Sequence, residues 1–253
     1  MELNKIYCID CIRGINMLED NFIDLVVTSP PYNVDLGNNK YNQNSYNLYN
    51  DNREHYEYIE WLKNIFSLLY VKISKGGRVC INIGDGKNGQ VPTSSDIISF
   101  MTKDIGYIPI THIIWNKSQV GNRTSWGSWL SPSCPSFPTP FEHIIVFAKE
   151  NKKLQSKGET DLERQEFIDW SLALWGFPPE TSQKRIGHPA MFPEELSKRC
   201  IKMFSWIDSV VLDIFAGAGT TLVTAKKLGR DYIGFEISQE YCDIANQRLL
   251  EIE

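Results

Sequence analysis

A glycine-rich turn near the end of the chain combines residue types that could hold a nucleotide-like ligand. In VVLDIFAGAGTT (210–221), an apolar run ends at Asp213, and the turn after it leads into Thr220 and Thr221 at the start of a predicted helix. Glycines let a ligand approach the backbone closely, and the first turn of a helix offers free N–H groups. Glu236 ends the next predicted strand. A carboxylate there can hold both hydroxyls of a ribose.

The order of glycines helps to choose between adenosine cofactors. A dinucleotide site usually has a third glycine for helix–strand packing, whereas this turn reads Gly217-x-Gly219-x-x-Leu222. A carboxylate at Asp213 would repel a pyrophosphate and attract a sulfonium group. The pattern therefore indicates S-adenosylmethionine rather than NAD. Two plainer interpretations stay open, with Gly219 as a close-packing glycine and Glu236 as a solvated strand end.

The second stretch that could do chemistry is TSPPY (28–32), where a predicted strand runs into two prolines and an aromatic ring. Proline offers no N–H group and fixes φ, so such a loop is stiff and its carbonyl groups point in set directions. By itself the pattern is more typical of a proline-rich turn that ends a strand.

Strands and helices alternate along the chain, which predicts an α/β fold with a doubly wound, mostly parallel sheet and helices on both faces. The stretch 33–56, rich in Asn and Tyr, is predicted to be a long surface loop. Pro109 indicates the edge or the start of its strand. Strands are predicted at 5–9, 23–28, 78–83, 107–116, 142–149, 209–214 and 231–235, and helices at 11–21, 56–74, 94–104, 161–174, 194–206, 219–228 and 238–251.

Length and composition limit the class of protein. A chain of 253 residues with 42% apolar residues suits one domain with a substantial core. No apolar run reaches the roughly 18 residues of a membrane helix, and MELNKIYCID lacks the features of a signal peptide.

Six scattered cysteines favour a reduced, cytoplasmic protein. One C-x-x-C (Cys8, Cys11) is a weak sign of zinc or redox chemistry, so no metal is expected. The net charge of −5 speaks mildly against nucleic acid.

The two stretches together resemble a known family. DIFAGAGTT (213–221) is similar to the D-P-F-x-G-x-G-T-T motif of S-adenosylmethionine-dependent DNA amino-methyltransferases, and TSPPY resembles their catalytic [DNS]-P-P-[YFW] motif. The catalytic motif comes first, as in the circularly permuted beta class. One departure is Ile214, which stands where proline is usual. The resemblance implies a Rossmann-like methyltransferase fold with a seven-stranded sheet, and it spans almost all of a single catalytic domain, 1–253.

The resemblance also implies roles for individual residues. Ser29 and the carbonyl of Pro30 would accept hydrogen bonds from the target amino group, Pro31 would stiffen the loop, and Tyr32 would stack on a base flipped out of the duplex. The short motif after the first strand and HPAMFP (188–193) resemble the family's adenine and methionine contacts. The implied cofactor site consists of Asp10, Cys11, Thr28, His188, Pro189, Phe192, Pro193, Asp213, Phe215, Ala216, Gly217, Gly219, Thr220, Thr221 and Glu236.

The implied substrate is double-stranded DNA, methylated on an exocyclic amino group. S-P-P-Y is the usual form in cytosine-N4 enzymes and D-P-P-Y in adenine-N6 enzymes, so cytosine N4 is expected and adenine N6 is the alternative. RNA or protein amino-methylation and an inactive binding module are more remote. A cognate restriction endonuclease is a possible partner, and the chain is expected to be a monomer or homodimer.

DNA is expected to dock over the mouth of the site despite the acidic total, because charge distribution matters more than net charge. Two segments outside the predicted core, 118–141 and 150–187, are predicted to be small DNA-recognition insertions. The candidates for phosphate contacts are Lys117, Arg123, Lys152, Lys153, Lys157, Lys184 and Arg185.

Overall fold

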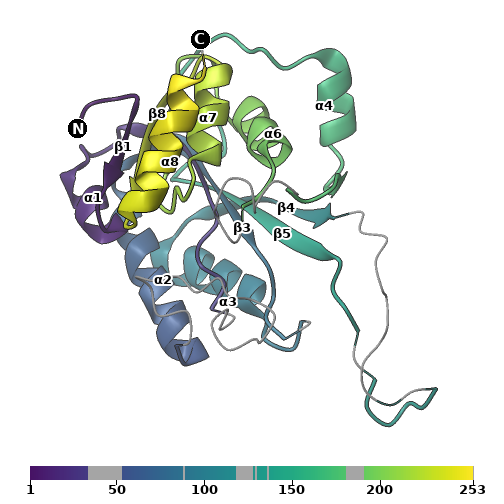
Figure 1. Ribbon diagram of the computed structural model, residues 1–253. Helices are drawn as coiled ribbons and strands as arrows, with labels where there is room; N and C mark the ends of the chain where they lie inside the picture. Colours follow the sequence, from purple (N-terminus) through teal and green to yellow (C-terminus); the bar gives the residue numbers. More distant parts are fainter. Residues whose placement is uncertain are drawn as a thin grey trace.

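The chain folds around one twisted sheet with helices on both faces (Figure 1). The computed structural model describes residues 1–33, 53–87, 89–117, 128, 130–135, 137–180 and 191–252. The described strands are β1 (Lys5–Cys8), β2 (Ile23–Thr28), β3 (Ile73–Ile83), β4 (Ile108–Asn116), β5 (Phe141–Ala148), β6 (Leu174–Gly176), β7 (Val210–Asp213) and β8 (Asp231–Glu236). The described helices are α1 (Cys11–Met17), α2 (His55–Tyr70), α3 (Thr93–Ser99), the π-helical η2 (Phe100–Ile105), α4 (Arg164–Trp170), α6 (Glu194–Phe204), α7 (Thr220–Lys227) and α8 (Gln239–Leu250).

The strands lie in the order β1-β8-β7-β2-β3-β5-β4-β6. All neighbours are parallel except β3 with β5 and β5 with β4, which are antiparallel. The prediction of a doubly wound, mostly parallel sheet is confirmed. The predicted number of strands is wrong by one: the described sheet has eight, because β6, at the end of the predicted helix 161–174, pairs with β4 where no strand was predicted.

Alternate residues of the strands point to opposite faces, and each face carries its own core. On β2, Val26 belongs to the core under α1, α2, α3 and η2, whereas Leu25 and Val27 belong to the core under α4, α6, α7 and α8. On β5, Ile145 and Ile144 divide in the same way. In Figure 1, α2 and α3 lie below the strands, and α4, α6 and α7 lie above them. Continuous apolar runs such as IDLVVT are therefore buried on both sides.

Two of the differences from the predicted elements change the local structure. The strand predicted at 78–83 starts at Ile73, so Gly76 and Gly77 lie inside it. Gly76 has φ 76°, and a Cβ there would lie 2.2 Å from the carbonyl oxygen of Lys153. These glycines therefore permit a close backbone approach within an irregular part of the strand. The helix predicted at 94–104 divides into α3 and η2.

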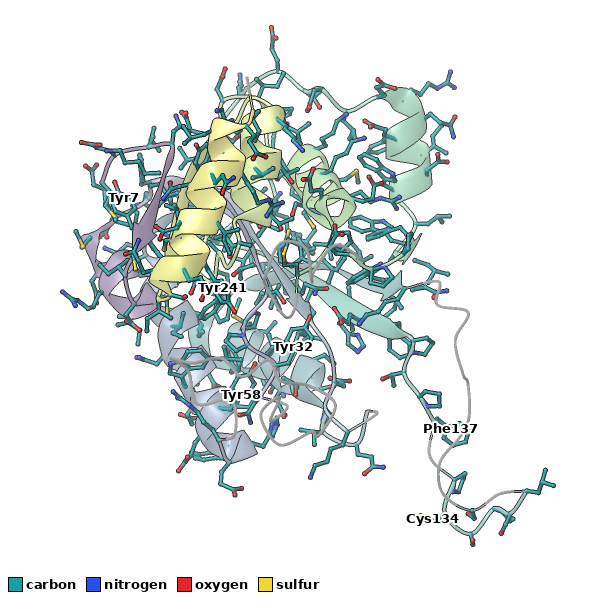
Figure 2. All side chains as sticks on the ribbon, viewed as in Figure 1. Tyr7, Tyr32, Tyr58, Cys134, Phe137 and Tyr241 are labelled. Carbon is teal, nitrogen blue, oxygen red and sulfur yellow. The ribbon has the colours of Figure 1, made fainter. Side chains whose placement is uncertain are left out.

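The ends of the strands define two sides of the sheet. The parallel strands end on one side, which we call the carboxyl edge, and begin on the other, which we call the amino edge. Asn116 pairs with Phe141 at the carboxyl edge, so the β4–β5 connection leaves the sheet there. Figure 1 shows the described part of this connection extending away from the body, and Cys134 and Phe137 lie far out on it in Figure 2. Of the helices in the described ranges, none is long and apolar enough to cross a membrane.

Candidate active site

Most of the described residues that the sequence predicts for the catalytic and cofactor sites lie in a row along the carboxyl edge. Adjacent parallel strands end side by side, which brings together residues that are far apart in the sequence. In sheet order the row consists of Asp10 and Cys11 after β1, Glu236 at the end of β8, Asp213 at the end of β7, and Thr28 to Tyr32 at and after the end of β2.

The loop after β2 is held from both sides. The Ser29 hydroxyl lies 3.1 Å from the carbonyl oxygen of Asn82 and 3.3 Å from the Tyr32 hydroxyl oxygen. Tyr58 of α2 donates its hydroxyl to the carbonyl oxygen of Pro31 at 2.6 Å. A Cβ on Gly84 would lie 3.2 Å from the Tyr32 ring, so the ring packs closely against this part of the backbone. The loop is therefore fixed by contacts as well as by its prolines. The residue labelled Tyr32 lies at the centre of the molecule in Figure 2.

The glycine-rich turn between β7 and α7 has the backbone that the sequence predicts. Gly217 and Gly219 have φ values of 50° and 79°, in the left-handed region that favours glycine. Both interpretations of Gly219 hold, because a Cβ there would also lie 2.7 Å from the Cβ of Ala245 on α8. Phe215 contacts Trp61 of α2, with ring centroids 5.7 Å apart. Thr220 and Thr221, in the first turn of α7, are buried.

Glu236 supports this turn directly. One carboxylate oxygen accepts a hydrogen bond from the Gly217 N–H at 2.9 Å, and the other accepts one from the Ser238 N–H at 2.8 Å. Each oxygen keeps a second lone pair that can accept a ligand hydroxyl. Partial burial raises the pKa of Glu236. Glu236 is therefore more than a solvated strand end.

Asp10 and Cys11 lie beside Glu236. Cys8 pairs with Glu236 in the sheet, and the Ile9 N–H donates to the Glu236 carbonyl at 2.8 Å. Asp10 caps α1 by accepting from the N–H groups of Ile12 and Arg13. Burial, then the charge of Asp10, raises the pKa of the Cys11 thiol to about 12. A thiol with so high a pKa is a poor nucleophile, which leaves Cys11 a packing role here.

Asp213 is a buried carboxylate between the two motifs. It is 1% exposed and accepts a hydrogen bond from Thr28 Oγ1 at 2.7 Å and another from the Phe215 N–H at 3.1 Å. Burial is the largest influence and raises the pKa of Asp213 to about 6. Thr28 thus joins the loop after β2 to the glycine-rich turn through one acid.

The raised pKa of Asp213 predicts a stability gain for Asp213→Asn. Because the folded protein holds this proton up to about pH 6 and the unfolded chain loses it near pH 4, the folded state binds more protons between these values. The contribution to the free energy of unfolding therefore falls as pH rises through that window, by at most about 3 kcal/mol. Urea unfolding should show Asp213→Asn to be more stable than the parent at pH 8, with the difference shrinking toward pH 4. A less stable variant at pH 8 would contradict the prediction.

The methionine end of the predicted site is described only in part. His188 and Pro189 lie outside the described residues. Phe192 is partly buried against the core under α6, and Pro193 is buried at the N-terminal cap of this helix. Pro193 thus opens the helix, as predicted.

Two polar residues of this edge did not emerge from the motif analysis. Asn82 near the end of β3 is 2% exposed and donates to the Tyr32 hydroxyl at 2.7 Å and to Glu142 at 2.8 Å. Glu142 of β5 is 8% exposed and accepts from the Tyr32 hydroxyl at 2.8 Å. In the sequence, the only sign of these two residues is that an amide and a carboxylate stand within the apolar runs RVCINI and EHIIVFAK.

The residues predicted to contact DNA are not brought together. Lys117 lies at the carboxyl edge, but it forms an ion pair with Glu142. Arg123, Lys184 and Arg185 lie outside the described residues. The exposed Lys152, Lys153 and Lys157 follow β5, whose last residue pairs with Arg78, so they lie toward the amino edge. They are therefore not at the mouth of the site, because an antiparallel strand carries the chain to the opposite edge.

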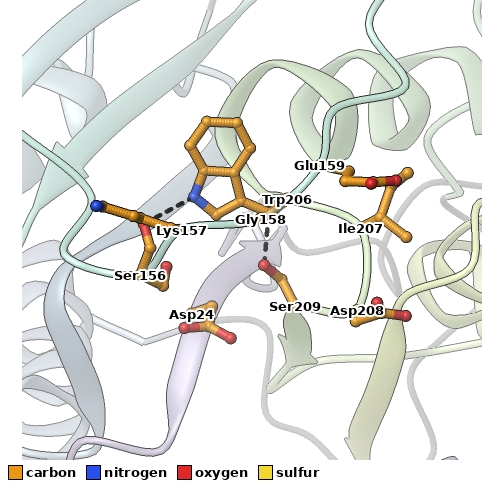
Figure 3. Close-up of a pocket in the computed structure, with 9 residues that line it drawn as sticks. All are labelled: Asp24, Ser156, Lys157, Gly158, Glu159, Trp206, Ile207, Asp208 and Ser209. Carbon is orange, nitrogen blue, oxygen red and sulfur yellow. Dashed lines mark hydrogen bonds between the residues drawn. The ribbon is translucent and has the colours of Figure 1, made fainter.

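A pocket confirms the position of Lys157. The pocket has a volume of about 440 Å³ and is lined by Lys157, Trp206, Asp24 near the start of β2 and Ser209 just before β7 (Figure 3). In it, Trp206 donates from its indole nitrogen to the Ser156 carbonyl at 3.1 Å and from its backbone N–H to the Ser209 hydroxyl at 3.1 Å. The pocket thus lies at the amino edge, away from the candidate site.

The described part of the 150–187 range, residues 150–180, which was predicted to belong to a recognition insertion, contributes to the body of the domain. α4 packs on α6, where Lys202 lies 5.9 Å from the centre of the Trp170 ring and pairs with Glu166. β6 extends the sheet beside β4. By contrast, Leu130 and Phe137 in the 118–141 range are 90% and 69% exposed.

Comparison with known proteins agrees with the geometry. A family model described as DNA methylase, of the N6/N4 type, matches residues 23–247. The type II methyltransferase M.MjaVI of Methanocaldococcus jannaschii is 39% identical over 184 residues, which cover 68% of this chain and 90% of that protein. The type II methyltransferase M.BglII of Bacillus subtilis is 30% identical over 263 residues, covering 98% and 69%.

A solved structure shares the fold. A Thermus thermophilus protein classed as a DNA modification methylase, in complex with S-adenosyl-L-methionine, superposes with a TM-score of 0.73 at 25% identity, over 97% of this chain and 92% of that one. The family model covers most of the sequence and includes both motifs of the carboxyl edge. This chain therefore belongs to the N6/N4 family of DNA methylases.

Proposed function

We propose that the chain transfers a methyl group from S-adenosylmethionine to the N4 amino group of cytosine in a specific sequence of double-stranded DNA. The observation that carries the proposal is the position of Ser29. Its hydroxyl lies at the carboxyl edge, next in the chain to Thr28. Thr28 donates a hydrogen bond to the buried Asp213, just before the glycine-rich turn. An acceptor for an amino group thus stands directly beside the proposed cofactor site.

The residues present fit S-adenosylmethionine. Glu236 has carboxylate lone pairs left for the ribose hydroxyls after it has accepted from Gly217 and Ser238. Asp213 offers a carboxylate for a cationic group, and the left-handed glycines keep side chains out of the turn. When bound, this cofactor supplies an electrophilic methyl group. Asp10, Cys11 and Phe215 lie where they can line the adenosine.

The proposed role of the loop follows from the chemistry of the target. An exocyclic amino group has its lone pair delocalised into the ring and is a poor nucleophile. Two acceptors aimed at its protons favour a pyramidal nitrogen with a free lone pair, which is electrostatic stabilisation of the transition state. Ser29 Oγ and the Pro30 carbonyl are the proposed acceptors, and the Tyr32 ring is the proposed stacking surface.

Cytosine is preferred over adenine because of the residue that opens the loop. The neutral Ser29 gives the S-P-P-Y form, which resembles the cytosine-N4 members, whereas the adenine-N6 members usually have an aspartate here. Either amine is conjugated and flanked by a ring nitrogen, so the acceptor pair could serve both. The base assignment therefore depends on Ser29 alone.

We propose that the β4–β5 connection makes part of the DNA interface. It leaves the sheet beside the catalytic loop, and Lys117 N–H donates to the Pro140 carbonyl at 3.0 Å where it begins. The exposed Leu130 and Phe137 are suited to contact with a partner. A restriction endonuclease for the same sequence is the proposed biological partner, since the relatives named above are type II methyltransferases.

Mass spectrometry of nucleosides tests the target base. Plasmid DNA is treated with the protein and S-adenosylmethionine carrying a labelled methyl group, then digested to nucleosides. We expect label in N4-methylcytosine. Label in N6-methyladenine alone would overturn the base assignment and leave the cofactor and loop roles intact. Label in RNA but not in duplex DNA would overturn the substrate class.

A further inference from the structure

A connected set of polar groups lies behind the catalytic loop. The contacts run from the Ser29 hydroxyl to the Tyr32 hydroxyl at 3.3 Å and from there to the Glu142 carboxylate at 2.8 Å. Asn82 contacts both Tyr32 and Glu142 through its side-chain amide nitrogen. These contacts connect the proposed target acceptor with a buried acid that the two motifs do not contain.

The donors and acceptors of Asn82, Tyr32 and Glu142 fix the direction of the hydrogen bonds among these three residues. The Asn82 Nδ2 group carries only donors, and the Glu142 carboxylate carries only acceptors. The Tyr32 oxygen therefore accepts from Asn82 and gives its own hydrogen to Glu142, so toward Ser29 it can act only as an acceptor. Ser29 has one hydroxyl hydrogen and two neighbouring acceptors, the Tyr32 oxygen at 3.3 Å and the Asn82 carbonyl oxygen at 3.1 Å. When that hydrogen points to Tyr32, the hydroxyl hydrogens of Ser29 and Tyr32 both point toward Glu142, and the Ser29 lone pairs are free to face the target.

The buried Glu142 carboxylate has Lys117 as its ion-pair partner. Glu142 is 8% exposed, and a buried carboxylate without a partner would be costly. Lys117 forms an ion pair with the carboxylate oxygen that does not contact Tyr32, so the buried acid has a partner. Burial, then the charge of Glu142, raises the pKa of Tyr32, so the phenol stays protonated and can pass a proton on only while it receives another.

We propose that Glu142 accepts the proton that the target amino group loses on methylation, through Ser29 and Tyr32. Methylation forms an N–C bond, breaks the S–CH₃ bond with its electron pair left on sulfur, and leaves one proton too many on nitrogen. That proton moves to Ser29 Oγ as the Ser29 proton moves to the Tyr32 oxygen and the Tyr32 proton moves to Glu142. The neutral Glu142 then releases the proton to solvent. This inference rests on the proposed function.

Glu142→Gln and Tyr32→Phe test the relay. The first keeps the shape of residue 142 but removes its basicity, and the second keeps the aromatic face but removes the hydroxyl. Removing proton transfer typically costs on the order of 10²-fold or more in rate. We expect each variant to lower kcat about 10²-fold with the KM for DNA within about threefold of the parent. The double variant should be no slower than the slower single variant, because both interrupt one route.

Lys202→Gln is the matched control, since it removes another largely buried ion pair, with Glu166, away from the loop after β2. We expect it to keep the parental kcat. A loss of kcat in Lys202→Gln equal to that in Glu142→Gln would overturn proton acceptance in favour of a general effect of losing a buried ion pair. Calorimetric binding of S-adenosylmethionine should match the parent in all variants, and circular dichroism should show each variant folded at the assay temperature.

A measurement that does not depend on methyl transfer completes the test. The pKa of Tyr32, followed by NMR of a ring-labelled tyrosine, should fall in Glu142→Gln because the neighbouring charge is gone. An unchanged pKa would show that the contact is absent and overturn the relay. A parent that transfers no methyl group overturns the proposed function, whereas an active parent with Glu142→Gln at the parental rate overturns the relay alone.

Discussion

Replacing Ser29 with alanine is expected to lower the rate of methyl transfer by about 10²–10³-fold, because one of two preorganised acceptors for the target amino group is lost. The Ser29 hydroxyl contacts the Asn82 carbonyl and Tyr32 and has no contact with Glu236 or the glycine-rich turn among the described hydrogen bonds. Cofactor affinity should therefore stay within about twofold of the parent. Single-turnover transfer of labelled methyl to DNA measures the first quantity, and calorimetry the second.

Ser205→Ala provides a control for the loss of a serine hydroxyl. Ser205 follows α6 and donates to the Ile201 carbonyl at 2.7 Å, away from the carboxyl edge. This variant should transfer methyl at the parental rate even if it unfolds at a lower temperature. A Ser29→Ala protein that also works at the parental rate would exclude Ser29 as an acceptor.

Replacing Glu236 with alanine should weaken the binding of S-adenosylmethionine by about 30–100-fold. Two ribose hydroxyls would lose their acceptor inside a partly buried site, and unsatisfied polar groups of this kind cost about 1–3 kcal/mol. The N–H groups of Gly217 and Ser238 would lose their partner too, which loosens the turn that contacts the ligand. A calorimetric titration with the cofactor alone measures the change without DNA.

Two further variants, Glu236→Gln and Glu240→Ala, test whether the loss of cofactor affinity is specific to the Glu236 carboxylate. Glutamine keeps one acceptor oxygen, so its affinity should fall between those of the parent and Glu236→Ala. Glu240 lies exposed in the first turn of α8, and its removal should leave affinity unchanged. Equal losses in Glu236→Ala and Glu240→Ala would indicate a general electrostatic effect and contradict the ribose contact.

Much of the fold was predictable because the signals are local. The β2 strand matches its prediction at both ends, and the other strands that were predicted are present with modest boundary shifts. A run of apolar, β-branched residues predicts a buried strand wherever it occurs, and glycine at a left-handed position predicts a turn. Pro109 lies near the start of β4, beyond the part that β6 covers, as expected for a residue without an N–H.

The elements that sequence analysis missed depend on distant partners. β6 has three residues, too few for a period to show, and it is a strand only because β4 offers an open edge at Ile114–Asn116. The first part of β3 contains two glycines, which locally predict the end of a helix, yet its pairing with β2 and its contact with Lys153 make it extended. Tertiary pairing therefore overrode local preference in both places.

The sequence by itself determined the two motifs, their order and the family that they indicate, because each motif is a short run whose chemistry depends on residues adjacent in the chain. Only the tertiary structure decided that the Tyr32 hydroxyl contacts the Glu142 carboxylate. Glu142 is 110 residues away from Tyr32 along the chain and comes from a strand that runs antiparallel to β3. That reversal brings the start of β5 to the edge where β2 and β3 end. It also carries Lys152, Lys153 and Lys157 toward the opposite edge, because a strand has two ends and only one can lie at the site.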